Sequence, residues 1–220
     1  MSPNDVSKKL MNEEYSKMDL KETLESPSWK MAVSFHGHVC PGLAIGFKAA
    51  QAAMSWLEDS RSADEEIVTI SETNACGVDA IQTMTGCTSG KGNLIIRDHG
   101  KNVFTMVSRS TGKGVRISLK PGVMSLDPRH QELINLMRSD SASKTEAEEF
   151  RRIHTQKSHS ILGKKPEEIF VISEAFIELP EKAKIEPSEL CGKCQEPTMP
   201  SKMVSAGNVR VCQDCYSRKS

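Results

Sequence analysis

The chain has 220 residues, and its 29 basic and 29 acidic side chains give a formal net charge of zero. This balance argues against a protein that is held to nucleic acid by bulk positive charge. No stretch approaches the roughly 18 consecutive apolar residues of a membrane span, and the polar start MSPNDVSKKLMNEEY does not resemble a signal peptide. We therefore expect a soluble, cytoplasmic protein with no membrane partner.

The composition along the chain divides it into four parts. Residues 1–28 form an N-terminal arm that ends near Pro27, and residues 29–178 carry the mixed apolar pattern of a core domain. The segment 179–189 is rich in charge and proline, which is typical of a linker. Residues 190–220 make up a second, small unit with four closely spaced cysteines.

The first predicted element of the core domain is a helix that starts at Pro41. Proline suits the first turn of a helix because its missing N–H needs no partner there. Apolar residues then recur at helical spacing as far as Leu57. A short β-branched run at residues 67–70 predicts a strand, and residues 77–86 have the spacing of a second helix that Gly86 ends.

The rest of the core domain is predicted to hold four more strands and two more helices. The strands are expected at residues 93–97, 103–109, 115–119 and 169–176, and the first three are joined by hairpin turns at His99-Gly100 and Thr111-Gly112. Two polar amphipathic helices are expected at residues 128–138 and 144–162. Because helices and strands mix without a βαβ rhythm, the predicted class is α+β, with a mixed, largely antiparallel sheet and a C-terminal zinc ribbon.

The tail has the spacing C-x2-C, seventeen residues, C-x2-C, which is typical of a tetrahedral zinc site. The predicted ligands are Cys191, Cys194, Cys212 and Cys215. Between the two pairs we expect a β-hairpin around Gly207-Asn208. About 30 residues bury too little surface to fold alone, so zinc would supply the missing stability. Four protein ligands close the coordination sphere, so this zinc is expected to be structural; a redox pair is the alternative, but it normally accompanies a βαβ pattern.

A cluster of two histidines and a cysteine precedes the helix predicted at Pro41. His36, His38 and Cys40 stand at i, i+2 and i+4, and in extended backbone these side chains point to the same side. Imidazole and thiolate are preferred ligands of zinc and related transition metals. The dipole at the helix N-terminus also favours the thiolate of Cys40. The cluster therefore predicts a metal site or a nucleophile; the alternative is two ordinary loop histidines and a buried cysteine.

A second cluster lies around the helix predicted at residues 77–86. Cys76 precedes this helix, as Cys40 precedes the earlier one, and Asp79 shares a helix face with Cys76. Cys87 follows the helix, either as a further cleft residue or as a small core residue. The glycine-rich turn 86–92 lets backbone amides approach a ligand, but it matches neither a Walker A loop nor a dinucleotide fingerprint.

The segments FHGHVCPGLAIGFKAA (35–50), ACGVDAIQTMTGCTSGKGNL (75–94) and RDHGKNVFTM (97–106) resemble the FmdE family, named for one of the polypeptides of formylmethanofuran dehydrogenase. The resemblance covers roughly residues 29–177 and implies intertwined homodimers of an α+β core, with a polar cleft that can hold a metal. The residues that match by position are His36, His38, Cys40, Cys76, Asp79, Gln82, Cys87, Lys91, Asp98 and Lys101. His99 departs from the tyrosine that the family often has.

The resemblance also implies that FmdE is an accessory to the molybdenum or tungsten enzyme and that some members carry a zinc ribbon. The sequence shows neither a pterin-binding signature nor a ferredoxin-type cysteine series. Oxidation of formylmethanofuran by this chain alone is therefore not expected.

Three functions follow from these patterns. The first is a metal-binding accessory or regulatory protein whose ribbon docks a protein partner and whose cleft holds zinc, nickel or iron. The cleft residues are His36, His38, Cys40, Cys76 and Cys87. The second is a free-standing metalloenzyme that acts on a small molecule. Its catalytic candidates are Cys40, Cys76, Asp79 and Lys101. The third and lowest-ranked is a ribbon-led nucleic-acid or transcription module, which the neutral charge argues against.

Overall fold

The computed structural model describes residues 18–218, so the part of the expected arm before residue 18 lies outside the described residues. The chain divides into two compact units, and the boundary falls between Lys182 and Ala183. Within residues 18–218, none of the helices combines the length and the apolar character that crossing a membrane requires.

The first unit is built on a five-stranded sheet with the strand order β2-β1-β3-β4-β5. The strands are β1 (Ile67–Ser71), β2 (Leu94–Ile96), β3 (Val103–Ser108), β4 (Gly114–Leu119) and β5 (Phe170–Glu174). β1 pairs with β2 in parallel, and the other three pairings are antiparallel. The predicted α+β class with a mixed, largely antiparallel sheet is confirmed.

The structure corrects one predicted connection. The hairpin turn expected at His99-Gly100 would pair β2 with β3, but β1 lies between these two strands. The connection instead crosses the end of β1, where the N–H groups of His99 and Lys101 donate to the carbonyl oxygen of Glu72 at 2.9 and 3.1 Å. The prediction is wrong because an apolar pattern identifies a strand without identifying its partner.

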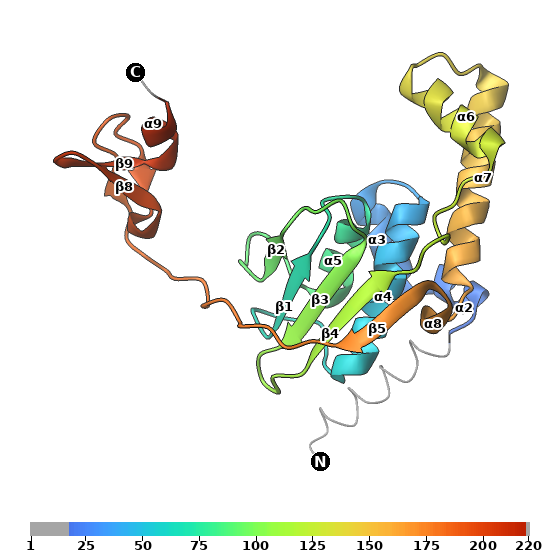
Figure 1. Cartoon of the computed structure of the whole chain (residues 1–220), viewed down its shortest axis with the longest axis horizontal. Helices are drawn as coiled ribbons and strands as arrows, with labels where there is room; N and C mark the ends of the chain where they lie inside the picture. Colours follow the sequence, from blue (N-terminus) through green and yellow to red (C-terminus); the bar gives the residue numbers. More distant parts are fainter. Residues whose placement is uncertain (1–17, 219–220) are drawn as a thin grey trace. The chain divides into compact units, whose positions relative to one another are not determined.

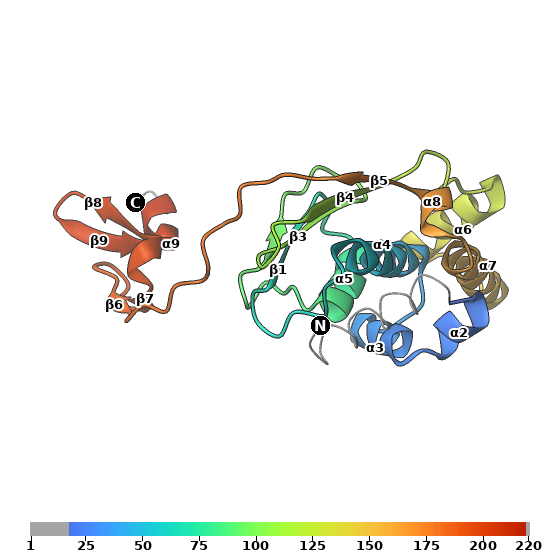
Figure 2. The same ribbon diagram turned by 90° about the horizontal axis from the view of Figure 1, so that it is seen from below.

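Seven helices accompany the sheet in the described part of this unit. They are α2 (Leu20–Glu25), α3 (Pro27–His36), α4 (Pro41–Leu57), α5 (Gly77–Thr85), α6 (Pro128–Arg138), α7 (Lys144–Leu162) and α8 (Pro166–Ile169). Helices α6 and α7 form a hairpin at one end of the unit (Figure 1). Helices α4 and α5 lie on one side of the sheet, and α3 and α2 lie beyond them (Figure 2).

Local signals in the sequence set several helix ends. The side chains of Asp127 and Ser143 accept hydrogen bonds from the N–H groups of His130 and Glu146, and so cap the starts of α6 and α7. Gly86 ends α5 in the left-handed conformation at φ 72°, which glycine adopts without steric cost. These signals explain why the predicted bounds of α6 and α7 agree with the structure.

Helices α4 and α5 pack against each other through glycine. A Cβ atom on Gly46 of α4 would overlap the carbonyl oxygen of Gly77 in α5, and one on Gly77 would lie 3.3 Å from the Cα of Gly46. The two backbones therefore approach more closely than any larger residue permits. This contact lies within two turns of the N-termini of both helices, and it brings their N-cap residues, Cys40 and Cys76, together.

The second unit consists of short elements around four cysteines. They are β6 (Glu189–Leu190), β7 (Pro197–Thr198), the 3₁₀ turn η1 (Pro200–Lys202), β8 (Met203–Ala206), β9 (Val209–Cys212) and α9 (Gln213–Ser217). β8 and β9 pair in antiparallel fashion, and Gly207 turns between them at φ 65°. The hairpin predicted around Gly207-Asn208 is therefore confirmed.

Candidate metal centres

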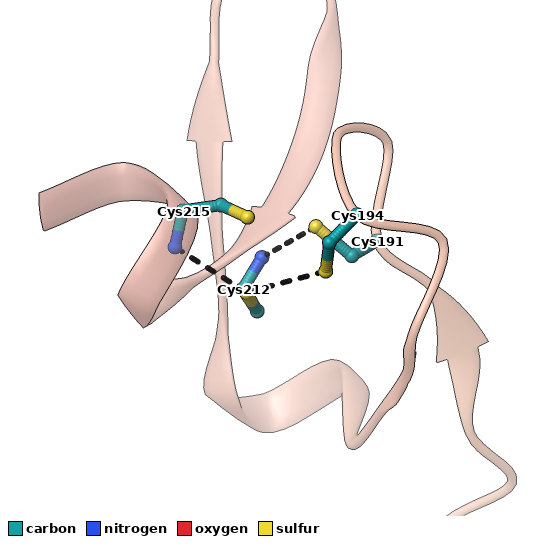
Figure 3. A group of neighbouring side chains, drawn as sticks. All are labelled: Cys191, Cys194, Cys212 and Cys215. Carbon is teal, nitrogen blue, oxygen red and sulfur yellow. Dashed lines mark hydrogen bonds between the residues drawn. The ribbon is translucent and has the colours of Figure 1, made fainter. Parts of the chain in front are cut away.

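The four cysteines of the second unit form one group. The sulfur atoms of Cys191, Cys194, Cys212 and Cys215 all lie within 4.8 Å of one another. Figure 3 shows two of them on the loop after β6 and two where β9 meets α9. The Sγ atoms of Cys194 and Cys212 are 3.9 Å apart. Two thiolates on a tetrahedral zinc ion with bonds of 2.3 Å stand about 3.8 Å apart, so the donor set fits zinc.

Backbone N–H groups prepare these thiols for ionisation. The N–H of Cys212 donates to the Sγ of Cys191 at 3.2 Å, and the N–H of Cys215 donates to the Sγ of Cys212 at 3.4 Å. The hydrogen bonds from Cys212 and Cys194 lower the pKa of Cys191 to about 6. Hydrogen bonds to the charged form favour that form, and the thiolate is the form that binds metal.

A second group of potential ligands lies in the first unit. The nearest donor atoms of His36, Cys40 and Cys76 lie within 4.8 Å of one another. His36 is the last residue of α3, and the two cysteines are the N-cap residues of α4 and α5. The Nε2 of His36 is 3.6 Å from the Sγ of Cys40. The glycine contact between α4 and α5 therefore assembles this group from residues that are up to 40 positions apart in the sequence.

A carboxylate orients the histidine of this core group. The Nδ1 of His36 lies 2.7 Å from the Oδ2 of Asp79, and the Nε2 of Gln82 donates to the other carboxylate oxygen at 3.4 Å. A proton held on Nδ1 leaves the lone pair of Nε2 directed at the two cysteines. This arrangement is the usual outer shell of a metal-bound histidine. Asp79 was expected as an acid–base candidate, and its contact instead assigns it to positioning His36.

The thiol of Cys40 does not ionise easily in the absence of a cation. Its Sγ accepts a hydrogen bond from the N–H of Leu43 at 3.3 Å, as expected at a helix start. The side chain is only 3% exposed, however, and burial raises the pKa of Cys40 to about 11 despite that bond. The prediction that the helix dipole favours the thiolate is therefore wrong for the metal-free chain, because the cost of burying the charge outweighs the dipole.

Two other predicted cleft residues lie outside the core group. His38 is exposed, and the centroid of its ring lies 4.5 Å from that of His36, with the two rings tilted by 34°. Cys87 is fully buried beyond the C-terminal end of α5, whereas Cys76 stands before its first residue. The thiol of Cys87 donates to the carbonyl of Ile67 at 3.3 Å. Cys87 is therefore a small core residue, which was the alternative interpretation.

The glycine-rich turn after α5 contacts the protein itself. The Nζ of Lys91 donates to the carbonyl oxygens of Ser62 and Ala63 at 3.2 and 3.3 Å. The side-chain amide of Asn93 donates to the carbonyl of Ile67 at 2.8 Å. These bonds hold the segment before β1 in place, so the backbone of this turn is occupied by structural contacts.

The third segment of the resemblance surrounds a different carboxylate. The carboxylate of Glu72 lies 3.1 Å from Arg116, 3.5 Å from His99 and 4.0 Å from Lys101. The side chain of Asp98 accepts a hydrogen bond from the N–H of Gly100 at 3.0 Å. Among the contacts of the described residues, none joins Lys101 or Asp98 to the core group.

One structural determinant of the core group was not predicted. Gly46 interrupts an apolar helical run in the sequence, and an isolated glycine inside such a run often marks a close backbone approach. That signal identifies Gly46 but not its partner Gly77, since the two are 31 residues apart.

A mixed α+β unit with a His/Cys group, followed by a four-cysteine unit, defines a protein with two potential metal centres. The family model described as FmdE, Molybdenum formylmethanofuran dehydrogenase operon, matches residues 35–171, and the chain belongs to this family.

One solved structure and one curated protein are similar to the chain. The structure is an FmdE-like protein of tungsten formylmethanofuran dehydrogenase type from Syntrophus aciditrophicus, with a TM-score of 0.55 over 91% of this chain and 94% of that one. At 24% sequence identity it supports the fold alone. The curated protein is named a probable S-adenosyl-L-methionine-binding protein of Archaeoglobus fulgidus and is 33% identical over 194 residues. The match covers 84% of this chain and 52% of the relative, so the chain spans about half the length of that protein.

Proposed function

We propose that the chain is a metal-binding accessory protein whose core group holds a transition metal with one coordination position left open. The observation that supports this proposal is the gathering of His36, Cys40 and Cys76 within 4.8 Å. Three protein ligands of nitrogen and sulfur are typical of zinc sites that keep a position for another ligand. Zinc is the metal that this borderline-soft donor set favours, with nickel and iron as alternatives.

The protein's own residues prepare this site for a ligand. Asp79 keeps the proton of His36 on Nδ1, and the burial of Cys40 keeps water away from one side of the group. A metal bound there would supply a Lewis acid that polarises a small ligand in the open position. In the second unit the four cysteines would hold a structural zinc, since four protein ligands leave no such position.

A free-standing metalloenzyme is the second candidate, and the open position favours it. Acid–base chemistry would also require a titratable side chain that is free to exchange a proton beside the ligand. Asp79 is engaged with His36, and Lys101 lies 4.0 Å from Glu72. The described contacts of these candidates support the accessory role over the enzyme.

Two further parts of the proposal concern partners. The homodimer implied by the family resemblance is a proposal that light scattering on the purified chain would test. The ligand in the name of the Archaeoglobus relative is not part of the proposal, because this chain covers only 52% of that protein.

Cobalt(II) substitution under anaerobic conditions tests the two centres separately. We expect two cobalt ions per chain, each with thiolate-to-cobalt absorption. The variant Cys76→Ser should lose the core signal alone, and the pair Cys191→Ser and Cys194→Ser should lose the tail signal alone. Added imidazole should shift the spectrum of the core cobalt and leave that of the tail unchanged. A core spectrum that imidazole does not change would contradict the open position, and a single cobalt that Cys76→Ser does not affect would contradict the core site.

A further inference from the structure

A hollow of about 770 Å³ lies between the last turns of α4, strand β5 and the start of α8. Six of the residues that line it are Gln51, Trp56, Glu58, Lys113, Lys165 and Glu174. Gln51 stands eleven residues after Cys40 along α4, a helical rise of about 16 Å. The hollow is therefore distinct from the core metal group, and its volume lies in the range of roughly 300–1,000 Å³ that is usual for small-molecule sites.

Gln51 is the unusual residue of this hollow. Its side chain is 2% exposed, and within residues 18–218 neither its amide nitrogen nor its amide oxygen has a hydrogen-bond partner. A buried donor or acceptor that lacks a partner costs about 1–3 kcal/mol, so native proteins rarely retain one without a reason. A ligand that offers both an acceptor and a donor at its edge would satisfy the whole carboxamide.

Lys48 lies one helical turn before Gln51, on the same face of α4. It is 5% exposed, and the structure gives it neither a hydrogen bond nor an ion pair with any described residue. Burial lowers the pKa of Lys48, and the nearby carboxylates of Glu167 and Glu168 only partly oppose this effect. Since Glu167 also lines the hollow, the amine of Lys48 lies next to it. An anionic group of a ligand would stabilise its charged form.

The mouth of the hollow adds an aromatic ring and a second cation. Trp56 is 44% exposed, which is high for a large apolar side chain that lines a concave surface. Lys165 precedes the first residue of α8, and Lys113 is paired with Glu58 at 3.5 Å. Lys165 has no ion pair among the described residues, so it is the rim cation that can bind an anion.

We propose that this hollow binds an adenine nucleotide. The carboxamide of Gln51 donates to N7 of the adenine and accepts from its N6 amino group, which is the bidentate pairing that glutamine makes with adenine. The indole of Trp56 stacks on the purine ring, and such stacking contributes substantially to the binding of bases. The ammonium groups of Lys48 and Lys165 hold the phosphate. The site needs no metal in the core group, so it stands or falls independently of the proposed function.

Isothermal titration of the full chain with AMP tests the proposal, with adenosine, GMP and ribose 5-phosphate as comparisons. We expect one AMP per chain. Adenosine should bind more weakly because it lacks the phosphate, and GMP at least about tenfold more weakly because its O6 and N7 offer Gln51 two acceptors and no donor. Equal affinity for GMP and AMP, equal affinity for ribose 5-phosphate and AMP, or no saturable binding of AMP would overturn the proposal.

Two variants report on the residues themselves. Gln51→Leu removes the carboxamide while keeping a buried side chain of similar size, so it should fold and bind AMP at least about tenfold more weakly. Trp56→Ala, at a partly exposed position, should have a similar effect, whereas Trp56→Phe should retain most of the affinity because it still stacks. Gln131→Leu, on the exposed face of α6, is the matched control and should bind AMP as the unchanged chain does. Unchanged AMP affinity in Gln51→Leu or Trp56→Ala would refute the assigned contacts.

Discussion

Replacing Asp79 by asparagine is expected to weaken metal binding at the core group about tenfold without unfolding the chain. Asp79 lies 2.7 Å from the Nδ1 of His36, and this contact fixes which ring nitrogen faces Cys40 and Cys76. Hydrogen bonds to charged groups contribute about 1.5–3 kcal/mol. The side chain of Asp79 is 34% exposed, and asparagine keeps a neutral acceptor, so the lower end of that range applies. A loss of about 1.4 kcal/mol corresponds to a factor of ten, which agrees with the roughly 10–100-fold effects of removing such partners.

The assay is competition for zinc with a chromophoric chelator. It is run in a chain that carries Cys191→Ser and Cys194→Ser, so that only the core group binds the metal. A double-mutant cycle with His36→Ala separates the positioning effect from the simple loss of a negative charge near a cation. In the His36→Ala background, Asp79→Asn should change the affinity much less.

Two results would refute this reasoning. One is an affinity that Asp79→Asn leaves unchanged, and the other is an equal loss with and without His36. The nitrogen chemical shifts of His36 provide an independent readout, because a merely structural role of Asp79 would not change the tautomer of the ring.

Three further predictions concern other parts of the chain. The double variant Cys191→Ser and Cys194→Ser should lose one zinc ion per chain in elemental analysis, and full retention of zinc would contradict the four-cysteine site. Gly46→Ala should lower the free energy of unfolding by roughly 1–3 kcal/mol or more in urea titrations, because its Cβ overlaps the backbone of Gly77. Burial and the nearby His130 and His38 lower the pKa of His154, so the folded chain disfavours its protonation. Stability should therefore fall as the pH decreases below about 6.5, less so in His154→Gln, whereas a pH-independent unfolding midpoint would contradict the effect.

Local patterns in the sequence determined the elements and one of the two metal groups. Pro128 and the cap residue Ser143 mark helix starts through contacts within one turn, so the bounds of α6 and α7 can be predicted from neighbouring residues. The spacing of Cys191 to Cys215 likewise confines four thiols to two tight turns, and these come together as predicted. In each case the interacting groups are close in sequence, so that few arrangements are possible.

The tertiary structure decided which distant segments meet. The apolar pattern of β2 did not reveal that it pairs in parallel with β1, and the three first-half cysteines gave no sign that Cys76 joins Cys40 while Cys87 does not. The contact of His36 with Asp79 spans 43 positions, and it depends on the packing of α4 against α5. Such contacts arise from the fit of whole elements, and no local periodicity records that fit. The sequence could therefore name the ligands of the core group, but only the packed helices could select three of them and assign Asp79 to orient one.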